Sequence, residues 1–559
     1  MHVPLCLALA LGCSRSVWAG VVPPSTTRPA EQERAPADTR HLFSRPDLAV
    51  PEAPAAHQLT LGSHPNPDVL NSPVRARVQA HQVQQQKQQQ KEQQKKPKIQ
   101  LSRRRRWWFG PRSTHNDDVH APSPSIGDVV TNTVYSGVYP VVNVTWGNKA
   151  GAANAAGQTF VSYVDTGSAD TFAVASTFRC VGMEGPSPGG EDRAGSATVT
   201  TTTTTTYSQA DCNFGALYDL NQGNFTNLTA RAFSISYFPE MESLQGSMGL
   251  APITVGGLTV AQQQVALIEA ARWTGDGVAA GLVGLSYPAM TSVEDRNTGL
   301  PATPYNPFFT SLAQQGIDGQ DANASAVFTL AVDRVPRGTP SWKPAGMLAL
   351  GGLVPSTYYE GHFTSVPIEP PAMLPKTSSF RAFYATTVQV VYGPPAYNMA
   401  TSDMSPGPSA LDSANLTSSP SFQAVMDSGT SANFVPTTAA AAINALFDPP
   451  AVFNKTLNYY VVDCDAKPPL VAYRIGAQAA AGTNSSASAG RLMPIDARDM
   501  IVRSLNGLPG YENVCFSSVA DGGQPYGGEL IIGSTWQRGY VVAYDQGRSM
   551  MHIAKRKPY

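Results

Sequence analysis

Two short segments of this 559-residue chain carry residue types that can do acid–base chemistry. Each places an aspartate, a hydroxyl residue, a glycine and a second hydroxyl residue in a row. They are Asp165-Thr166-Gly167-Ser168 and Asp427-Ser428-Gly429-Thr430. A single tetrad of this kind is also typical of an Asx-turn at the end of a strand, so one copy would be a weak signal. Two copies in matched surroundings indicate a duplicated site with two cooperating carboxyl groups.

The chemistry open to such a pair follows from its charge. Two carboxyl groups held side by side cannot both ionise, so they share one proton and titrate as a unit. The carboxylate then takes a proton from water while the protonated carboxyl polarises a carbonyl group, which allows an amide to be hydrolysed without a covalent intermediate. Glycine lets the N–H groups of the turn approach the carboxylates, and the hydroxyls satisfy the remaining oxygen lone pairs.

The sequence around each tetrad is also repeated, which indicates how the two aspartates are positioned. An apolar run precedes each tetrad, at 161–164 and 423–426, and a phenylalanine follows after three further residues. A second repeat comes later, as Gly281-Leu282-Val283-Gly284 and as Leu530-Ile531-Ile532-Gly533. Apolar residues ending in glycine suit a buried strand on which another backbone packs closely. We therefore expect two homologous lobes, each presenting one aspartate at a strand end.

Composition and periodicity favour an all-β protein. Charged residues make up only 14% of the chain, while glycine (48) and proline (46) are plentiful. Short apolar or alternating runs divided by turn residues predict strands at 134–144, 159–164, 232–237, 327–332 and 383–391. A helical pattern is found mainly at 437–446. This distribution excludes coiled coils and helical solenoids.

The first 113 residues differ from the rest of the chain. A short apolar stretch ending in Val17-Trp18-Ala19 predicts a signal peptide over residues 1–19. Residues 20–113 are basic, low in complexity and too poor in apolar residues to form a core, so we expect a removable pro-segment. Its Arg103–Arg106 cluster fits cleavage by a kexin-like protease. The alternative, a nuclear address or nucleic-acid patch, is disfavoured behind a signal peptide.

The remaining sequence fits export without a membrane anchor. No later stretch reaches eighteen apolar residues, and the C-terminus is basic. Four cysteines remain after the signal peptide, which suits two disulfides in an oxidising compartment; pairing of neighbours, Cys180 with Cys212 and Cys464 with Cys515, is the simplest of the three connectivities. Seven sequons predict a glycosylated surface, at Asn143, Asn224, Asn227, Asn323, Asn415, Asn454 and Asn484.

Over residues 130–559, the motifs resemble those of the pepsin-like aspartic proteases. The resemblance includes the two tetrads, the segments 281–288 and 345–352, the Cys464/Cys515 pair and the closing segment 530–545. It implies a bilobal all-β fold with pseudo-twofold lobes at 129–340 and 341–559 and few short helices. It also implies an endopeptidase whose catalytic dyad is Asp165 and Asp427. Ser168 and Thr430 would then bond the outer carboxylate oxygens, and Thr166 with Ser428 would join the two loops.

The resemblance also suggests substrate contacts. Ile235-Ser236-Tyr237 is similar to the strand that delivers the family's flap tyrosine, which covers bound substrate; an ordinary core or surface tyrosine is the alternative. Phe172 stands where relatives often carry a tryptophan, and its ring cannot donate a hydrogen bond to that tyrosine. Phe172 and Leu282 are candidates for lining an apolar pocket beside the dyad. Glu240 or Glu242 would favour substrates with Lys or Arg.

The distribution of charge along the chain suggests how the pro-segment acts. Residues 1–113 carry a net charge of +10, and residues 114–559 carry −11. Such parts should associate at neutral pH and separate as carboxylates protonate, which predicts an acid-activated zymogen inhibited by its own pro-segment.

Other partners and activities have little support in the sequence. The sequence contains neither a His-Glu-x-x-His motif nor paired Cys-x-x-Cys motifs, so we expect no metal or cofactor. We expect a monomer that acts on peptide or protein substrates, outside the cell or in the vacuolar lumen, without nucleic acid. The alternative is a secreted pseudo-protease that binds peptide or glycan without cleaving it. Loss of either aspartate would mark such a protein, and both are present.

Overall fold

The structure is a computed structural model that describes residues 58–60, 62–63, 140–147, 157–183, 204–237, 242–273, 275, 277–317, 326–334, 346–395, 416–455, 459–476, 490–503, 514–523 and 530–558. The predicted signal peptide, the Arg103–Arg106 cluster and the sequons at Asn323, Asn415 and Asn484 lie outside these residues.

The first part of the chain forms a ten-stranded sheet in the order β11-β7-β8-β9-β5-β10-β4-β3-β2, with β6 paired to β5. Its strands are β2 (Gly62–Ser63), β3 (Pro140–Trp146), β4 (Gln158–Asp165), β5 (Thr171–Met183), β6 (Thr204–Tyr207), β7 (Thr226–Tyr237), β8 (Glu242–Val255), β9 (Leu258–Arg272), β10 (Gly281–Gly284) and β11 (Val293–Asp295). Strand β10 is buried along its whole length between β4 and β5, which explains its apolar sequence.

The second part forms an eight-stranded sheet in the order β22-β21-β15-β17-β26-β18-β25, with β16 paired to β15, and a four-stranded sheet in the order β19-β20-β24-β23. The strands are β15 (Ala385–Gly393), β16 (Thr417–Ser418), β17 (Phe422–Met426), β18 (Asn433–Val435), β19 (Val452–Asn454), β20 (Tyr459–Val462), β21 (Leu470–Ile475), β22 (Arg491–Pro494), β23 (Ile501–Arg503), β24 (Cys515–Ser517), β25 (Val519–Asp521) and β26 (Ile531–Ile532). Strand β17 runs parallel to β26, as β4 does to β10.

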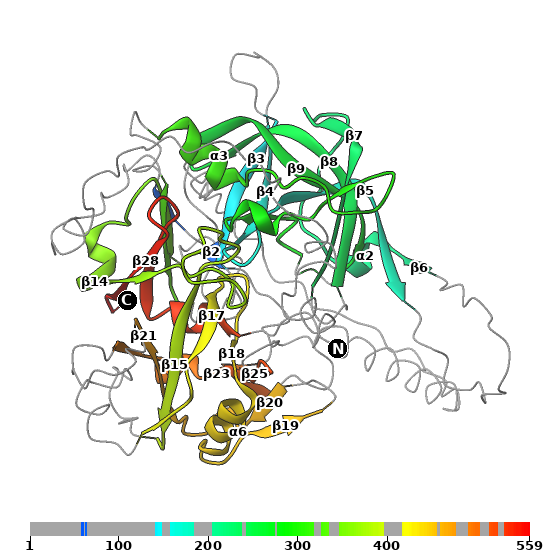
Figure 1. Ribbon diagram of the computed structural model, residues 1–559. Coiled ribbons are helices and arrows are strands. Elements are labelled where there is room, and N and C mark those ends of the chain that lie inside the picture. Colours follow the sequence, from blue (N-terminus) through cyan, green and yellow to red (C-terminus); the bar gives the residue numbers. More distant parts are fainter. Residues whose placement is uncertain are drawn as a thin grey trace, which may run out of the picture.

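A six-stranded sheet combines segments that are far apart in the sequence, in the order β1-β13-β12-β27-β28-β14. Its strands are β1 (Gln58–Thr60), β12 (Val327–Val332), β13 (Gly346–Leu350), β14 (Tyr359–Pro367), β27 (Tyr540–Asp545) and β28 (Met550–Arg556). Figure 1 shows the large first sheet at the top, the eight- and four-stranded sheets at the bottom, and β14 and β28 at the side. The expected boundary at 340/341 falls between β12 and β13, which are neighbours in this sheet.

The described helices are short, as an all-β protein requires. They are α2 (Gln209–Cys212), α3 (Phe308–Gln315), α6 (Thr437–Ala445) and α7 (Ser534–Gln537), together with three 3₁₀ turns at Pro288–Met290, Ser356–Tyr358 and Ala497–Asp499. Helix α6 lies where the helical pattern was expected and buries Ala440 and Ile443. The prediction of an all-β, bilobal fold with few helices is confirmed.

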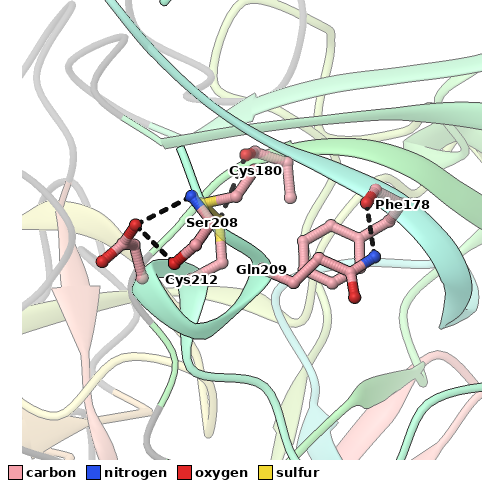
Figure 2. The surroundings of a disulfide bond; sticks show 7 residues. Phe178, Cys180, Ser208, Gln209 and Cys212 are labelled. Atoms are coloured by element: carbon pink, nitrogen blue, oxygen red, sulfur yellow. Dashed lines mark hydrogen bonds between the residues drawn. A yellow bond between two sulfur atoms is a disulfide. The ribbon is translucent and has the colours of Figure 1, made fainter. Parts of the chain in front are cut away.

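Two disulfides hold peripheral segments to the sheets. Cys180 bonds Cys212, and Cys464 bonds Cys515, the pairing of neighbours that we expected. Figure 2 shows the first bond beside α2, where the side-chain amide of Gln209 donates to the carbonyl oxygen of Phe178 at 2.7 Å. The disulfide and this hydrogen bond both attach α2 to β5.

Candidate active site

The two tetrads occupy the same place in their sheets. Asp165 is the last residue of β4, and Asp427 follows directly after β17. In each lobe, a parallel strand flanks the aspartate: the Leu285 N–H donates to the Asp165 carbonyl at 2.8 Å, and the Asp427 N–H donates to the Ile532 carbonyl at 3.0 Å. The repeated apolar segments are therefore the strands β10 and β26, which fix the backbone on either side of the aspartates.

Each aspartate carboxyl group receives the same pair of hydrogen bonds from its own loop. Asp165 accepts from the Gly167 N–H at 2.7 Å and from the Ser168 hydroxyl at 2.5 Å. Asp427 accepts from the Gly429 N–H at 2.8 Å and from the Thr430 hydroxyl at 2.5 Å. Both carboxyl groups are held in orientation by bonds to both of their oxygens, as the tetrads indicated.

The two loops are joined by a reciprocal set of hydrogen bonds. The Thr166 hydroxyl donates to the Met426 carbonyl at 2.9 Å and accepts from the Ser428 N–H at 2.9 Å. In return, the Ser428 hydroxyl donates to the Val164 carbonyl at 2.7 Å and accepts from the Thr166 N–H at 3.1 Å. All four hydrogen bonds are buried, so removing one hydroxyl would leave buried polar atoms without partners. This set of bonds is what fixes one lobe against the other at the site.

The glycines of the tetrads show that the two aspartates face each other. A Cβ atom placed on Gly167 would lie 2.6 Å from the Asp427 Cγ, and one placed on Gly429 would lie 2.5 Å from the Asp165 Oδ1. Real Cβ atoms essentially never approach other atoms so closely. Each glycine therefore makes room for the carboxyl group of the opposite lobe. Residues separated by 262 positions form one site.

The surroundings of the pair favour a shared proton. Asp165 is 6% exposed and Asp427 is 8% exposed. Burial, and then the charge of Asp165, raise the pKa of Asp427 well above its usual range, against the smaller effects of hydrogen bonds from Thr430 and Gly429. Two adjacent buried carboxyl groups cannot both carry a charge at low cost. The pair therefore shares a single proton and titrates as a unit.

The expected substrate-contact residues lie in the first lobe. Phe172 on β5 and Leu282 on β10 are directly paired across the strands and are both buried in an apolar cluster with Phe233. Tyr237 ends β7, where it is paired with Glu242 at the start of β8. The residues between them, 238–241, which include Glu240, lie outside the described chain. The structure thus brings Phe172 and Leu282 together and places Tyr237 near the tip of a hairpin.

Sequence reasoning missed a group that supports the first loop from the other lobe. The Tyr384 hydroxyl donates to the Leu285 carbonyl at 2.5 Å, and the Gln546 amide donates to the Tyr384 hydroxyl at 2.7 Å. Leu285 is the residue whose N–H binds Asp165. Tyr384 also packs against Tyr544, with ring centroids 4.6 Å apart. The closing segment 530–545 pointed to this region, but nothing in it singled out these side chains.

Asp170 was also missed. It lies five residues after Asp165, is 1% exposed, and accepts hydrogen bonds from the Ser292 N–H and the Tyr305 hydroxyl. The sequence signal was an acidic residue two positions after the first tetrad, where the second copy has Ala432.

Metal and membrane features can be examined only for the described part of the chain. There, no group of three or more His, Cys, Asp or Glu side chains could hold a metal ion. Within the same residues, no helix is long and apolar enough to cross a membrane.

Comparisons with known proteins identify the family of this chain. Residues 154–556 match the family described as eukaryotic aspartyl protease. A protein of Aspergillus fumigatus described as a probable aspartic-type endopeptidase is 30% identical over 407 residues, which cover 72% of this chain and 77% of that protein. The crystal structure of an aspartic proteinase from Irpex lacteus is 18% identical, covers 77% of this chain and 97% of its own, and gives a TM-score of 0.49. The chain belongs to the eukaryotic aspartyl protease family and is an aspartic endopeptidase, a hydrolase of peptide bonds.

Proposed function

We propose that Asp165 and Asp427 form the catalytic dyad and hydrolyse peptide bonds in acid through a water molecule held between them. The protonated Asp427 polarises the scissile carbonyl, and the Asp165 carboxylate takes a proton from the water as its oxygen attacks the carbonyl carbon. Asp165 then passes this proton to the amide nitrogen, the C–N bond breaks with release of the amine, and the dyad is left with the single proton on Asp427. The observation that carries this proposal is that the glycine of each tetrad lies against the aspartate of the other.

The raised pKa of Asp427 supports activity in acid. Its carboxyl group must be protonated to polarise the carbonyl, and this form is lost as the pH rises through its pKa. Since burial and Asp165 raise that pKa, the active form extends further toward neutral pH than an exposed aspartate would allow. We expect a bell-shaped pH dependence that belongs to the pair as a whole.

Residues 20–113 are proposed to act as an inhibitory pro-segment. Within this range, β1 pairs with Met347–Ala349 of β13 and β2 pairs with Pro140–Val141 of β3. These backbone bonds, and the opposite charges of the two parts of the chain, support binding of the pro-segment to the protease body. Cleavage after Arg106 by a kexin-like protease, followed by incubation in acid, would then separate them.

Secretion and glycosylation remain part of the proposal. The two disulfides favour an oxidising compartment, outside the cell or in the vacuolar lumen. Of the sequons in the described chain, Asn224 and Asn227 are exposed, while Asn143 and Asn454 are half-buried. Asn224 and Asn227 are therefore the sites that a glycosyltransferase would reach most easily. Peptide mapping before and after enzymatic deglycosylation would identify the modified residues.

The dyad is tested with purified, acid-treated protein on casein or haemoglobin at acidic pH. We expect proteolysis that pepstatin blocks and that Asp165→Asn and Asp427→Asn each abolish. Asp448→Asn is the matched control, because the Asp448 side chain is exposed and makes a surface ion pair with Lys467 far in sequence from either tetrad. Proteolysis that survives either dyad substitution would overturn the assignment. Absence of cleavage by the wild type, with retained peptide binding, would identify a pseudo-protease.

Substrate preference is a separate part of the proposal. Phe172 and Leu282 would favour large apolar side chains beside the scissile bond, with Tyr237 covering the substrate, while Glu240 or Glu242 would favour Lys or Arg. A cleavage profile on a peptide library, with and without the double change Glu240→Gln/Glu242→Gln, tests this. An unchanged frequency of basic residues at the cleavage sites would dispose of the role of the glutamates.

A further inference from the structure

Tyr384 lies directly ahead of β15 in the second lobe, and its hydrogen bonds reach the segments that carry both aspartates. Its backbone carbonyl accepts from the N–H of Met426 at 2.9 Å, and Met426 is the residue before Asp427. Its side-chain hydroxyl donates to the Leu285 carbonyl at 2.5 Å, and the Leu285 N–H donates to the Asp165 carbonyl at 2.8 Å. One fully buried residue therefore connects the strand that leads to Asp427 with the residue that holds the backbone of Asp165.

The direction of each bond to the Tyr384 hydroxyl follows from the chemistry of its partners. The Leu285 carbonyl can only accept, so the hydroxyl proton points at it. The hydroxyl oxygen then accepts from the side-chain amide of Gln546 at 2.7 Å. Thr310 of α3 donates to the oxygen of the same amide at 3.2 Å, which leaves the NH₂ group for Tyr384. Burial raises the pKa of Tyr384 well above its usual range, so the hydroxyl remains a donor in acid and at neutral pH.

The ring of Tyr384 packs against three other aromatic rings. Its centroid lies 5.2 Å from that of Tyr287, 5.7 Å from that of Phe328 and 4.6 Å from that of Tyr544. Phe328 is on β12 and Tyr544 is on β27, which are neighbours in the six-stranded sheet. A tyrosine side chain has two rotatable bonds, and close packing of its ring restricts both. The side chain is therefore a spacer of fixed length between its own backbone and Leu285.

The matching carbonyl of the second tetrad's lobe is bonded within that lobe. In the repeated apolar segments, Ser534 stands where the first copy has Leu285. The Ser534 carbonyl accepts from the Arg538 N–H at 3.1 Å, at the end of α7. The Leu285 carbonyl instead accepts from Tyr384, with the amide of Gln546 at 3.4 Å, and both of these residues belong to the second half of the chain. The position of Leu285 therefore depends on the other lobe, while that of Ser534 does not depend on the first.

We propose that Tyr384 is a positioning residue for the reaction, whose hydroxyl sets the separation of the two aspartates by holding Leu285 at a fixed distance from the strand before Asp427. The proposal rests on the dyad function proposed above. The Leu285 N–H holds the backbone of Asp165, so a shift of Leu285 is passed to Asp165, while the bond to Met426 keeps the Asp427 side in place. Two carboxyl groups that share one proton and act on one water molecule tolerate such a shift poorly.

Tyr384→Phe tests the proposal, because it removes the hydroxyl and keeps the ring. We expect kcat on a peptide substrate in acid to fall about tenfold, because the reacting groups are displaced. KM should stay within about twofold of wild type, because the groups that bind substrate are unchanged. Assays are run well below the melting temperature of the variant, where a merely structural role would leave kcat at the wild-type value. A wild-type kcat in Tyr384→Phe would overturn the proposal.

Tyr540→Phe is the matched control. The Tyr540 hydroxyl is also buried and also donates to a backbone carbonyl, that of Pro494 at 3.0 Å. Pro494 ends β22, which lies at one edge of the eight-stranded sheet, separated from β17 by two strands. The two variants should therefore lose similar amounts of stability, measured as melting temperature, while Tyr540→Phe keeps wild-type kcat. Equal losses of kcat in the two variants would contradict a specific role of Tyr384.

Gln546→Met separates the two bonds of the Tyr384 hydroxyl. It removes the amide but leaves the bond to Leu285, so kcat should fall by less than in Tyr384→Phe. The amide lies 3.4 Å from the Leu285 carbonyl and can replace a missing tyrosine hydroxyl there. The double variant Tyr384→Phe/Gln546→Met removes both donors and should have the lowest kcat of the series, with KM again near wild type. If Tyr384→Phe fails to fold, the double variant, which also lacks the unpaired amide, decides the question, and a wild-type kcat in it contradicts the proposal.

Comparison with Asp165→Asn separates this inference from the dyad function. If Asp165→Asn leaves proteolysis intact, the dyad assignment fails, and the positioning role of Tyr384 fails with it. If Asp165→Asn abolishes proteolysis while Tyr384→Phe and Tyr540→Phe have the same kcat, the dyad stands and only the inference about Tyr384 fails. An inactive Asp165→Asn together with a tenfold loss of kcat at unchanged KM in Tyr384→Phe supports both.

Discussion

The two aspartate loops make the same contacts with the carboxyl groups but differ in the side chains that support the loops. Both use a glycine N–H and a hydroxyl on the carboxyl oxygens, and both exchange two hydrogen bonds with the other loop. Beyond that, the Asp170 side chain after the first loop accepts from Ser292 and Tyr305, whereas the Asn433 side chain after the second loop accepts from the Gly533 N–H. The two loops thus share the groups that bond the aspartate carboxyl groups and differ in the groups that support them.

The frame around the two carboxyl groups is nearly symmetric. The bonds to them match within 0.1 Å, so they do not by themselves distinguish Asp165 from Asp427. The two side chains are also almost equally buried, at 6% and 8% exposed. Burial and the charge of Asp165 raise the pKa of Asp427, so the pair shares one proton. Variants that alter one loop at a time therefore test whether the two aspartates contribute equally.

The largest expected effect comes from filling the space between the loops. Gly167→Ala and Gly429→Ala each place a Cβ against the opposite carboxyl group, so the aspartate must move. Displacement of a catalytic group by about 1 Å lowers kcat by roughly 100-fold or more. Because the two approaches are equally close, we expect similar losses from either change, measured as kcat/KM on a peptide substrate.

Gly539→Ala is the control for that experiment. A Cβ on Gly539 would meet its nearest neighbour, the Trp536 carbonyl oxygen, at 3.5 Å, which is ordinary contact. This variant should keep wild-type activity. A loss of kcat/KM in Gly167→Ala that is much larger than in Gly429→Ala would contradict the expectation of similar losses, because it would show that one aspartate tolerates displacement.

The next effect concerns the bonds between the loops. Thr166→Val and Ser428→Ala each remove one hydroxyl that makes two buried hydrogen bonds across the site. Losing these bonds and leaving their partners unsatisfied should lower the free energy of unfolding by about 2–4 kcal/mol in each case. Chemical denaturation monitored by tryptophan fluorescence measures this loss.

The double variant Thr166→Val/Ser428→Ala tests whether the bonds between the loops act together. The Thr166 hydroxyl and the Ser428 hydroxyl lie in one network, so the combined loss should be smaller than the sum of the two single losses. Additive losses would show that the two sets of bonds act independently, against the reciprocal arrangement that the distances describe. Thr145→Val provides a control, since its hydroxyl makes a bond on the protein surface.

Much of this site was accessible from the sequence, because its chemistry is local. The tetrads, the apolar strands before them and the later Gly-ending strands all lie within short windows, where residue type constrains backbone geometry directly. The helix at 437–446 was predictable for the same reason. What these features share is that a few adjacent residues determine the outcome.

The remaining features depend on partners far away in the chain. Asp170 is distinguished from an exposed acid by Tyr305, 135 positions later, and Tyr384 acts on a carbonyl 99 positions earlier. Strand β1 pairs through its backbone over three residues, so its sequence need not show a strand pattern. For the strand expected at 134–144, the described element is β3, which begins at Pro140 and continues to Trp146. Such pairings need an arrangement in space that residue type alone does not specify.

The smallest expected effect is on the pH dependence of the dyad. Thr430→Val removes a hydroxyl whose hydrogen bond lowers the pKa of Asp427. The pKa should therefore rise, and because the protonated form polarises the carbonyl, the neutral limit of kcat/KM should move upward by about one pH unit. Activity at the optimum should fall by about tenfold, since the hydroxyl that orients the Asp427 carboxyl group is lost. A pH–rate profile that moves toward acid would contradict the assignment of the shared proton to Asp427, and would place it on the first lobe instead.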